Sequence, residues 1–344
     1  GPGQHSSRED GYEDYLWARF SSGTSFSVND GAVTVSSFFL GDELFQNYNI
    51  NDDGSYVPIS ANFDGIGLFC HEFSHALGLP DLYYTGKNTT ISKTIRTMGY
   101  WDLMDYGQYM YNGYYPPAYS AYERSFLGWL DIKELTDPEF VTLYPSGSED
   151  LGPTACVIRN PENEKEYYIF QNRQDRTWYH ANFLGHGLLV THVDYSASLW
   201  TSNSVNNDPD HRRVMYVPAD NGYNLTYRQS GESSTDFWNT YRNDLFPGGL
   251  GVKDFTDTTT PSADVFTPSG KLGAPVYGIT EHGDGTITFA FLEKSLTGVQ
   301  GVTTEENGTA TEVYGINGRR LPGLQGAAPG VYIVRQGDTV RKVL

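Results

Sequence analysis

The chain has 344 residues, a formal net charge of −19 and an aromatic content of 15%. This length accommodates about two domains with a sizeable core. The acidic balance argues against nucleic acid and anionic membranes as partners, because phosphate groups repel negative charge. No apolar run approaches the roughly 18 residues that a membrane span requires, so we expect no transmembrane segment.

The N-terminal residues 1–65 contain short β-like runs separated by turn residues. Phe26–Val28 and Ala32–Leu40 are the two clearest runs. Asn51–Gly54 has the composition of a turn. We therefore expect short strands, and no long helix, at the start of the chain.

A helix is predicted to begin at Asp64-Gly65. Gly78 and Pro80 end it, because glycine is the usual C-terminal cap and proline cannot continue the hydrogen bonding. Its apolar residues recur at helical spacing and predict a buried face: Ile66, Phe69, Cys70, Phe73 and Leu77.

The remainder of the chain is predicted to be mainly β. An irregular stretch covers residues 84–117, and a second helix is predicted from about Ala118 to Leu130. From about Thr142 to Phe291, strand runs alternate with Asn, Asp, Ser and Gly. The clearest strands are at 166–170, 187–193, 213–217 and 286–291. Residues 295–312 indicate a linker, and Asn317-Gly318 is a hairpin turn in a short closing β segment.

The first helix carries the pattern HExxH. His71 and His75 lie one turn apart on the same face, so both imidazoles can reach one Zn²⁺. Glu72 lies beside the first histidine and can act as general base toward a water on the metal. The alternative is a pair of solvated or capping histidines on an amphipathic helix.

Asp81 follows Gly78 by three residues. In the longer pattern HExxHxxGxxH, the glycine turns the chain so that a third ligand returns to the metal. An aspartate fills that place here, and its oxygen is a competent zinc donor. The alternative is a loop aspartate held by its own backbone, since Pro-Asp is common turn chemistry.

A methionine and a tyrosine downstream are further candidates. Met104 is the candidate for the apolar floor that metzincins place beneath the metal, and Met98 is a weaker rival. The hydroxyl of Tyr106 is predicted to face the metal or the developing oxyanion. Ordinary packing is the alternative and is more common for one tyrosine among 26.

Two other polar clusters offer metal ligands. Asn206–Asp210 and Asp220-Asn221 carry oxygen donors of the kind that Ca²⁺ takes, and a solvated acidic turn is the alternative. A second metal site is geometrically permitted for four residues: His186, His192, Asp194 and His211. Structural hydrogen bonding within the β part is the favoured interpretation of these four.

Four segments carry a combination of motifs: HEFSHALGLPDLY (71–83), MGYWDLMD (98–105), GHGLLVTHVDY (185–195) and VNNDPDHRRVMYVPADN (205–221). Together they resemble the immune inhibitor A-type metallopeptidase family, over roughly residues 1–292. The resemblance implies a metzincin-like secreted zinc endopeptidase, often calcium-containing and made as a zymogen. It also implies that His71, His75 and Asp81 are the metal ligands and Glu72 the base.

The two ends of the chain differ from that family. Its members have a longer stretch before the zinc helix than the 70 residues that precede His71, so we expect a catalytic module that is partial at its N-terminus. Residues 313–344 resemble the C-terminal sorting or attachment domain of Bacteroidetes secreted proteins. The alternative for this tail is a small β appendage with no such role.

The predicted fold class is α+β, in three parts. A metzincin-like zinc protease module covers residues 1–135, a β-sandwich-like module covers 136–294, and a linker with a short β tail covers 295–344. The predicted function is that of a monomeric, secreted or cell-surface zinc endopeptidase, in which Glu72 activates a zinc-bound water against peptide bonds of extracellular proteins.

Two alternatives to this function stay open. One is a secreted adhesive, or a glycan- or protein-binding protein, with a structural zinc site. The other is a different zinc hydrolase, such as an amidase. The presence of Glu72 favours an enzyme, because a structural zinc site does not need this residue.

Overall fold

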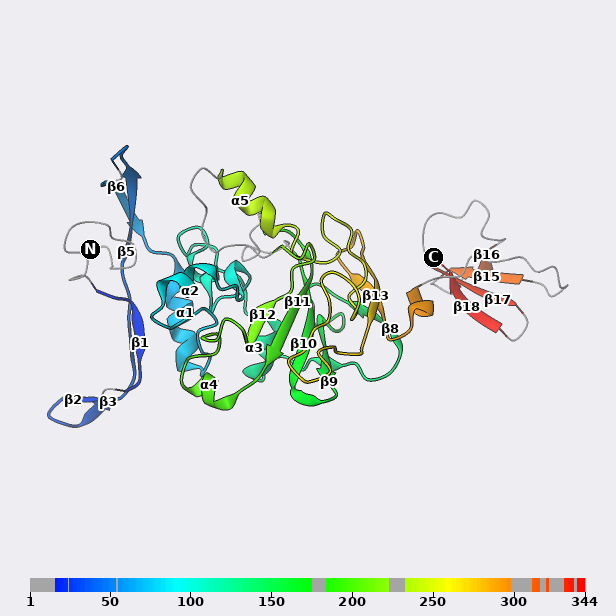
Figure 1. Ribbon diagram of the computed structural model, residues 1–344, viewed down its shortest axis with the longest axis horizontal. Coiled ribbons are helices and arrows are strands. Elements are labelled where there is room, and N and C mark those ends of the chain that lie inside the picture. The colour runs from blue at the N-terminus through cyan, green and yellow to red at the C-terminus, as the bar shows by residue number, and fades with distance from the viewer. Residues whose placement is uncertain are drawn as a thin grey trace.

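The computed structural model describes residues 16–23, 25–53, 55–174, 184–222, 233–297, 311–315, 320–321, 331–336 and 339–343. Short N-terminal hairpins lie at one end of the molecule, a central body follows, and a small C-terminal sheet lies at the other end (Figure 1). Among the described residues, no helix has both the length and the apolar character needed to cross a lipid bilayer.

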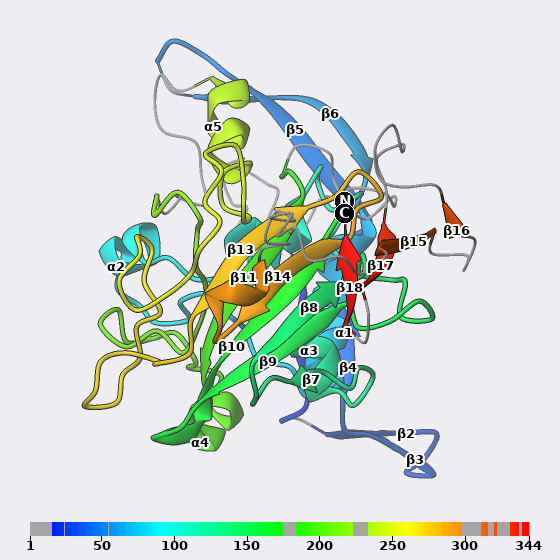
Figure 2. The same ribbon diagram turned by 90° about the vertical axis from the view of Figure 1, so that its right-hand side faces the viewer.

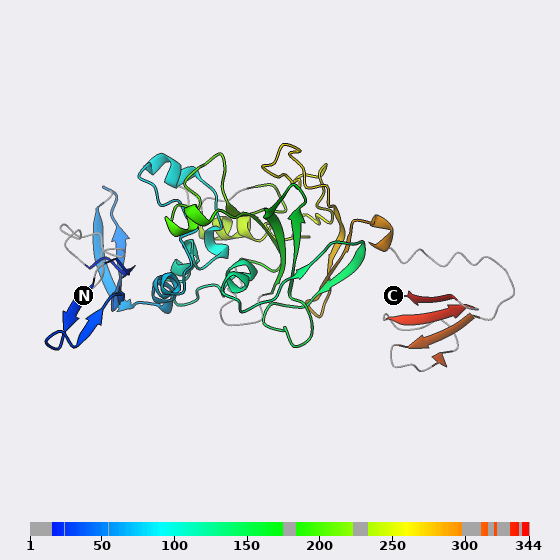
Figure 3. The same ribbon diagram turned by 90° about the horizontal axis from the view of Figure 1, so that it is seen from below.

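The N-terminal strands form three antiparallel pairs. β1 (Arg19–Ser21) pairs with β4 (Phe38–Leu40), β2 (Phe26–Val28) with β3 (Val33–Val35), and β5 (Leu44–Ile50) with β6 (Tyr56–Phe63). The predicted strand run that ends at Leu40 is therefore divided into β3 and β4. Every residue of β6 is exposed, and the hairpins project from the central body (Figure 3).

The predicted first helix is confirmed as α1 (Ile66–Ala76). Leu77 caps it, and Gly78 follows with a φ of 97°, a backbone conformation that favours glycine. The chain therefore turns sharply after His75, and this turn brings the loop that carries Asp81 back beside the helix.

The predicted buried face of α1 is wrong. Ile66, Phe69 and Phe73 are each about half exposed, at 50%, 51% and 48%. The buried side of the helix carries a different set of residues: Gly67, Leu68, His71, Glu72 and Ser74.

A close backbone contact accounts for this orientation of α1. A Cβ atom at Gly67 would lie 2.0 Å from the carbonyl oxygen of Gln108, so only glycine allows this approach. The side of α1 that carries Gly67 and the first histidine is thereby turned inward, and the apolar stripe is turned outward.

Four short helical elements connect α1 to the sheets: α2 (Thr89–Thr94), η2 (Gly99–Trp101), η3 (Tyr106–Tyr109) and α3 (Ala121–Phe126). A capping box starts α3, because Ser120 and Glu123 each accept a hydrogen bond from the other's backbone N–H. The helix is shorter than the predicted range 118–130, since Gly128 has a φ of 72° and stops it.

The central body contains two sheets. The larger has the strand order β12-β11-β10-β9-β7 and the smaller the order β13-β14-β8, and all neighbours are antiparallel except β7 and β9. The smaller sheet is layered over the larger one (Figure 2). Their strands are β7 (Lys133–Glu134), β8 (Glu139–Leu143), β9 (Ala155–Asn160), β10 (Asn163–Arg173), β11 (Gly187–Asp194), β12 (Val214–Tyr216), β13 (Val276–Glu281) and β14 (Ile287–Phe291).

The larger sheet is covered on both faces. Every residue of β11 is buried. Leu188 and Val190 belong to the core shared with the smaller sheet, whereas Leu189 and Val193 belong to a second core that includes Met104. The predicted boundary at residue 135 therefore separates parts that share a core. The division into a metzincin-like and a sandwich-like module stays a prediction.

The last elements of the body are α4 (Ala197–Thr201), α5 (Ser234–Tyr241) and η4 (Lys294–Thr297). The C-terminal sheet has the order β16-β15-β17-β18 and its own small core around Val313 and Val334. Its strands are β15 (Thr311–Gly315), β16 (Arg320–Leu321), β17 (Tyr332–Gln336) and β18 (Thr339–Val343). The predicted turn at Asn317-Gly318 and most of the predicted linker lie outside the described residues.

The core between the two sheets gives a test of the fold. Phe255 is fully buried and contacts the rings of Tyr168, Phe170 and Phe246. We expect Phe255→Ala to lower the free energy of unfolding by about 3–5 kcal/mol, through lost burial and a cavity. Urea denaturation measures this change. Leu151→Ala, at a site that is 61% exposed, is the control and should change it by less than about 0.5 kcal/mol.

Candidate metal centre

The three predicted ligands converge in the structure. Nε2 of His71 lies 3.1 Å from Oδ1 of Asp81, and Nε2 of His75 lies 3.3 Å from the same oxygen. One ligand atom from each of the three side chains lies within 4.8 Å of the others. In the described part of the chain, no other group of three His, Cys, Asp or Glu side chains is close enough to hold a metal ion.

Backbone carbonyls fix the tautomer of both histidines. The carbonyl oxygen of Leu103 lies 2.9 Å from Nδ1 of His71, and that of Leu79 lies 2.8 Å from Nδ1 of His75. A carbonyl oxygen can only accept a hydrogen bond, so each Nδ1 carries a proton. In the neutral rings Nε2 therefore presents a lone pair, as in a metal-binding histidine.

Asp81 completes a group of three acceptors. Its side chain is buried, and Oδ1 has no hydrogen-bond donor among the described residues. Three lone pairs that face one another without a donor require a cation between them or an extra proton on a histidine. Two imidazoles and one carboxylate are a donor set of catalytic zinc sites, so the residues fit Zn²⁺.

The charged groups at this site shift one another's pKa values. Burial alone would raise the pKa of Asp81, but the contacts with His71 and His75 hold it well below its usual range. Burial alone would lower the pKa of His75, but the Asp81 carboxylate gives it a net rise. A metal at this site would therefore compete with protons for the Nε2 atoms of the two histidines.

Glu72 lies beside the three ligands. It is 9% exposed, and its Oε2 accepts a hydrogen bond of 2.5 Å from the backbone N–H of Phe20 in β1. Burial raises the pKa of Glu72, and the neighbouring histidines and the Phe20 N–H only partly offset this effect. A raised pKa makes a carboxylate a stronger base near neutral pH.

A cavity of about 530 Å³ opens onto this group. Strand β1 contributes one wall and α1 with its following loop another, so Glu72 and the ligands can be reached from outside. The lining includes Phe20, Glu72, His75, Asp81, Tyr83 and Asn203.

One tyrosine contacts a predicted ligand, and a second tyrosine contacts the first. Tyr83 stacks on the ring of His71, with centroids 6.1 Å apart, and lines the cavity. Tyr106 contacts the ring of Tyr83 at 6.4 Å. Burial and the charge of Asp81 raise the pKa of Tyr83. Tyr83 was missed from the sequence, although it lies only two residues after Asp81, and the catalytic role of Tyr106 stays a prediction.

The Met104 turn supports the ligands through its backbone. The carbonyl oxygen of Leu103, the residue before it, accepts a hydrogen bond from Nδ1 of His71. The carbonyl oxygen of Met104 accepts a hydrogen bond of 2.8 Å from the N–H of Leu82. Met104 and Met98 are both fully buried. The turn is thus in contact with both ligand segments, and the role of the Met104 side chain as a floor stays a prediction.

A buried acid pair holds this turn. Asp102 and Glu123 are both fully buried, and burial raises the pKa of both carboxyl groups. The charge of Asp102 adds to the effect of burial at Glu123, whose pKa is raised well above its usual range, and this favours the protonated form of Glu123. Oδ1 of Asp102 accepts a hydrogen bond of 2.8 Å from the N–H of Met104. Asp102 therefore holds the turn beneath His71.

The calcium expectation finds no support in the structure. The amide of Asn206 donates to the carbonyl oxygens of Leu82 and Val214, at 2.7 and 2.8 Å. The amide of Asn207 donates to Thr85 Oγ1 at 3.0 Å. These side chains hold two loops together, and their amides are directed at protein atoms.

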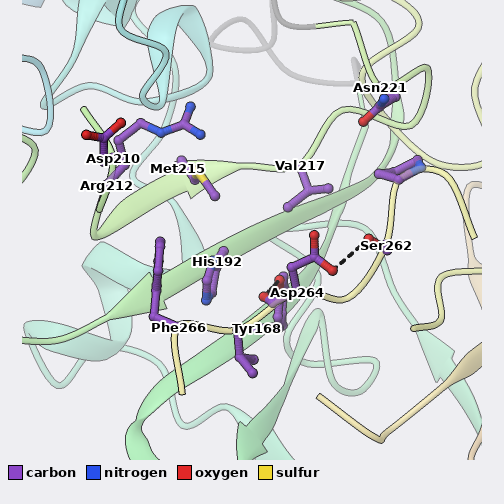
Figure 4. Close-up of a pocket in the computed structure, with 12 residues that line it drawn as sticks. Tyr168, His192, Asp210, Arg212, Met215, Val217, Asn221, Ser262, Asp264 and Phe266 are labelled. Atoms are coloured by element: carbon purple, nitrogen blue, oxygen red, sulfur yellow. Dashed lines mark hydrogen bonds between the residues drawn. The ribbon is translucent and has the colours of Figure 1, made fainter. Parts of the chain in front are cut away.

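The four residues considered for a second metal site form separate pairs. His192 lies 3.0 Å from Glu166, His211 lies 2.7 Å from Asp194, and His186 lies 2.6 Å from Glu281. This confirms the favoured interpretation as structural hydrogen bonding. His192 also lines a cavity of about 260 Å³, where its ring stacks on Tyr168 and Phe266, at 4.5 and 5.4 Å (Figure 4).

Comparison with known proteins agrees with this chemistry. Residues 12–130 match the family model described as the immune inhibitor A peptidase M6 catalytic domain. The pre-pro-metalloprotease PrtV of Vibrio cholerae serotype O1, from strains M66-2 and El Tor Inaba N16961, is 27% identical over 188 residues. The alignment covers 47% of this chain, which spans about a fifth, 19%, of the length of these relatives. No solved structure matches the chain.

The Asp102–Glu123 pair predicts how stability depends on pH. The folded state keeps Glu123 protonated at pH values where the unfolded chain ionises it. Its contribution to stability is therefore complete below the unfolded pKa of about 4.3 and is lost as the pH rises toward the folded pKa. Glu123→Gln keeps the size of the side chain and removes this titration.

We expect the melting temperature of the parent to fall relative to that of Glu123→Gln as the pH is raised from about 5 to about 8. Differential scanning calorimetry measures both profiles. Glu162→Gln, at an exposed position, is the control and should follow the parent. Parallel profiles for the parent and Glu123→Gln would contradict the raised pKa of Glu123.

Proposed function

We propose that the chain is a zinc-dependent endopeptidase whose metal is held by His71, His75 and Asp81. The observation that carries the proposal is the buried Oδ1 of Asp81, which faces the lone pairs of two histidines with no donor among the described residues. The similarity of residues 12–130 to a metallopeptidase catalytic domain supports it independently.

The residues around the site suit hydrolysis of a peptide bond. Bound Zn²⁺ supplies Lewis acidity, which lowers the pKa of a water and polarises a carbonyl group. Glu72 takes a proton from the attacking water and delivers it to the nitrogen of the leaving amine. The N–H of Phe20 occupies Oε2 of Glu72, so we assign the proton transfer to Oε1.

We propose protein or peptide substrates and an extracellular location. Both are drawn from the resemblance to metallopeptidases, whose relatives in Vibrio cholerae are named as pre-pro-metalloproteases. A sorting or attachment role for the sheet β15–β18 belongs to the same proposal. The main alternative, a binding protein with a structural zinc site, predicts metal without hydrolysis, and the next experiment separates the two.

Glu72→Gln tests the mechanism. We expect the variant to keep about one zinc per chain, because Glu72 is not a ligand, and to lose hydrolysis of casein by about 10²–10⁴-fold, the usual contribution of a general base. Metal analysis and a casein assay measure the two effects. Asp81→Ala is the ligand control and should bind zinc much more weakly, through the two histidines alone, and lose activity. Casein hydrolysis by Glu72→Gln at the parental rate would refute the role of Glu72, and a parent without zinc would refute the site.

Tyr106→Phe tests the second catalytic residue. We expect kcat to fall by about 10²–10³-fold with a small change in KM, because removal of an oxyanion donor acts on the transition state. Tyr83→Phe is the matched comparison, since Tyr83 stacks on His71 and Tyr106 contacts Tyr83. If kcat falls in Tyr83→Phe and not in Tyr106→Phe, the hydroxyl of Tyr83 is the oxyanion donor instead.

A further inference from the structure

Asp81 is held by a residue far away in the sequence. Its backbone N–H donates to Oδ1 of Asn203 at 2.7 Å, and Nδ2 of Asn203 donates to Oδ2 of Asp81 at 2.6 Å. The oxygen and the nitrogen of the Asn203 side-chain amide are therefore both hydrogen-bonded to Asp81. We infer that Asn203 is a positioning residue that orients Asp81 as the third ligand, an inference that rests on the proposed zinc site.

The contact selects which oxygen of Asp81 faces the metal. Asn203 occupies Oδ2, so Oδ1 is directed toward the two Nε2 atoms. Before a cation binds, three acceptors at such short range repel one another. A carboxylate free to rotate would turn away, and the two hydrogen bonds to Asn203 oppose that rotation.

Asn203 is itself firmly placed. It follows α4 with a φ of 54°, a left-handed conformation that asparagine tolerates better than most residues. Its carbonyl oxygen accepts a hydrogen bond of 2.7 Å from Thr85 Oγ1. Trp200 in α4 is buried, and its indole N–H donates to the hydroxyl of Tyr122 in α3. Helix α4 therefore fixes Asn203 to the core.

Two further asparagines hold the same loop. Asn206 binds the carbonyl oxygen of Leu82, and Asn207 accepts a hydrogen bond of 2.9 Å from the N–H of Thr85. Of these three asparagines, only Asn203 contacts Asp81. A substitution of Asn207 therefore removes a contact to the loop and leaves Asp81 and its partner unchanged. All three asparagines lie beyond residues 12–130, so the orientation of the third ligand depends on a part of the chain outside the matched catalytic segment.

The test uses the full chain and the variant Asn203→Gly, since glycine accepts the positive φ and removes only the side chain. We expect the affinity for Zn²⁺ to fall by about 10–100-fold, the usual effect of losing a partner of a metal ligand. Competition with a chromophoric chelator measures the affinity. The d–d absorption of the Co²⁺-loaded protein should also change, because the coordination by Asp81 changes.

Three controls separate positioning from general loosening. Asn221→Gly makes the same substitution at another left-handed position, with a φ of 57°, and should keep parental affinity. Asn207→Ala should lower the affinity by less than about threefold. In an Asp81→Ala background, Asn203→Gly should change it by less than about twofold, because its effect passes through Asp81.

The inference is overturned if Asn203→Gly binds Zn²⁺ within about twofold of the parent, or if Asn207→Ala weakens binding as much. Should Asn203→Gly not fold by circular dichroism, Asn203→Asp carries the test. It keeps the shape and the acceptor for the Asp81 N–H and loses the donor to Oδ2, so an unchanged Co²⁺ spectrum would overturn the inference. A parent chain that binds no zinc refutes the proposed function instead, which distinguishes the two failures.

Discussion

Two hydrogen bonds from histidine rings to backbone carbonyl oxygens determine the tautomer of His71 and His75 and the direction of their free nitrogen atoms. They place a proton on Nδ1 of His71 and of His75 and leave both Nε2 lone pairs directed at one carboxylate oxygen. Without them either ring could rotate or change tautomer, and the three acceptors would not converge. Each bond depends on a different piece of chain: Leu79 at the end of α1, and Leu103 in the turn before Met104.

The rest of the fold serves to keep those two carbonyls and Asp81 in place. Asp102 holds the Leu103–Met104 turn through the N–H of Met104, and Met104 shares a core with Leu189 and Val193 of the larger sheet. The loop after α4 holds Asp81 from the other side. The three side chains of the candidate metal site lie between residues 71 and 81, whereas the elements that hold them are spread over more than a hundred residues.

Local spacing made part of this predictable. The HExxH pattern and Gly78 were sufficient to predict α1, its end and the set His71, His75 and Asp81, because ligand spacing on a helix and the turn after it are local. The buried face of α1 was predicted wrongly, since apolar periodicity could not reveal the close approach at Gly67. The sequence also did not reveal partners that are distant along the chain. Nothing near Asp81 indicates Asn203, and nothing near Asp102 indicates that Glu123 is buried as well.

The separation of 122 residues between Asp81 and Asn203 has a consequence for the synthesis of the protein on the ribosome. A ribosome that adds about 5–20 residues per second needs about 6–24 s to pass from one to the other. During that interval α1 and its histidines have already been synthesised, while Asp81 still lacks the amide that orients it. The order of synthesis therefore leaves Asp81 without its Asn203 partner until the segment that follows α4 has been made.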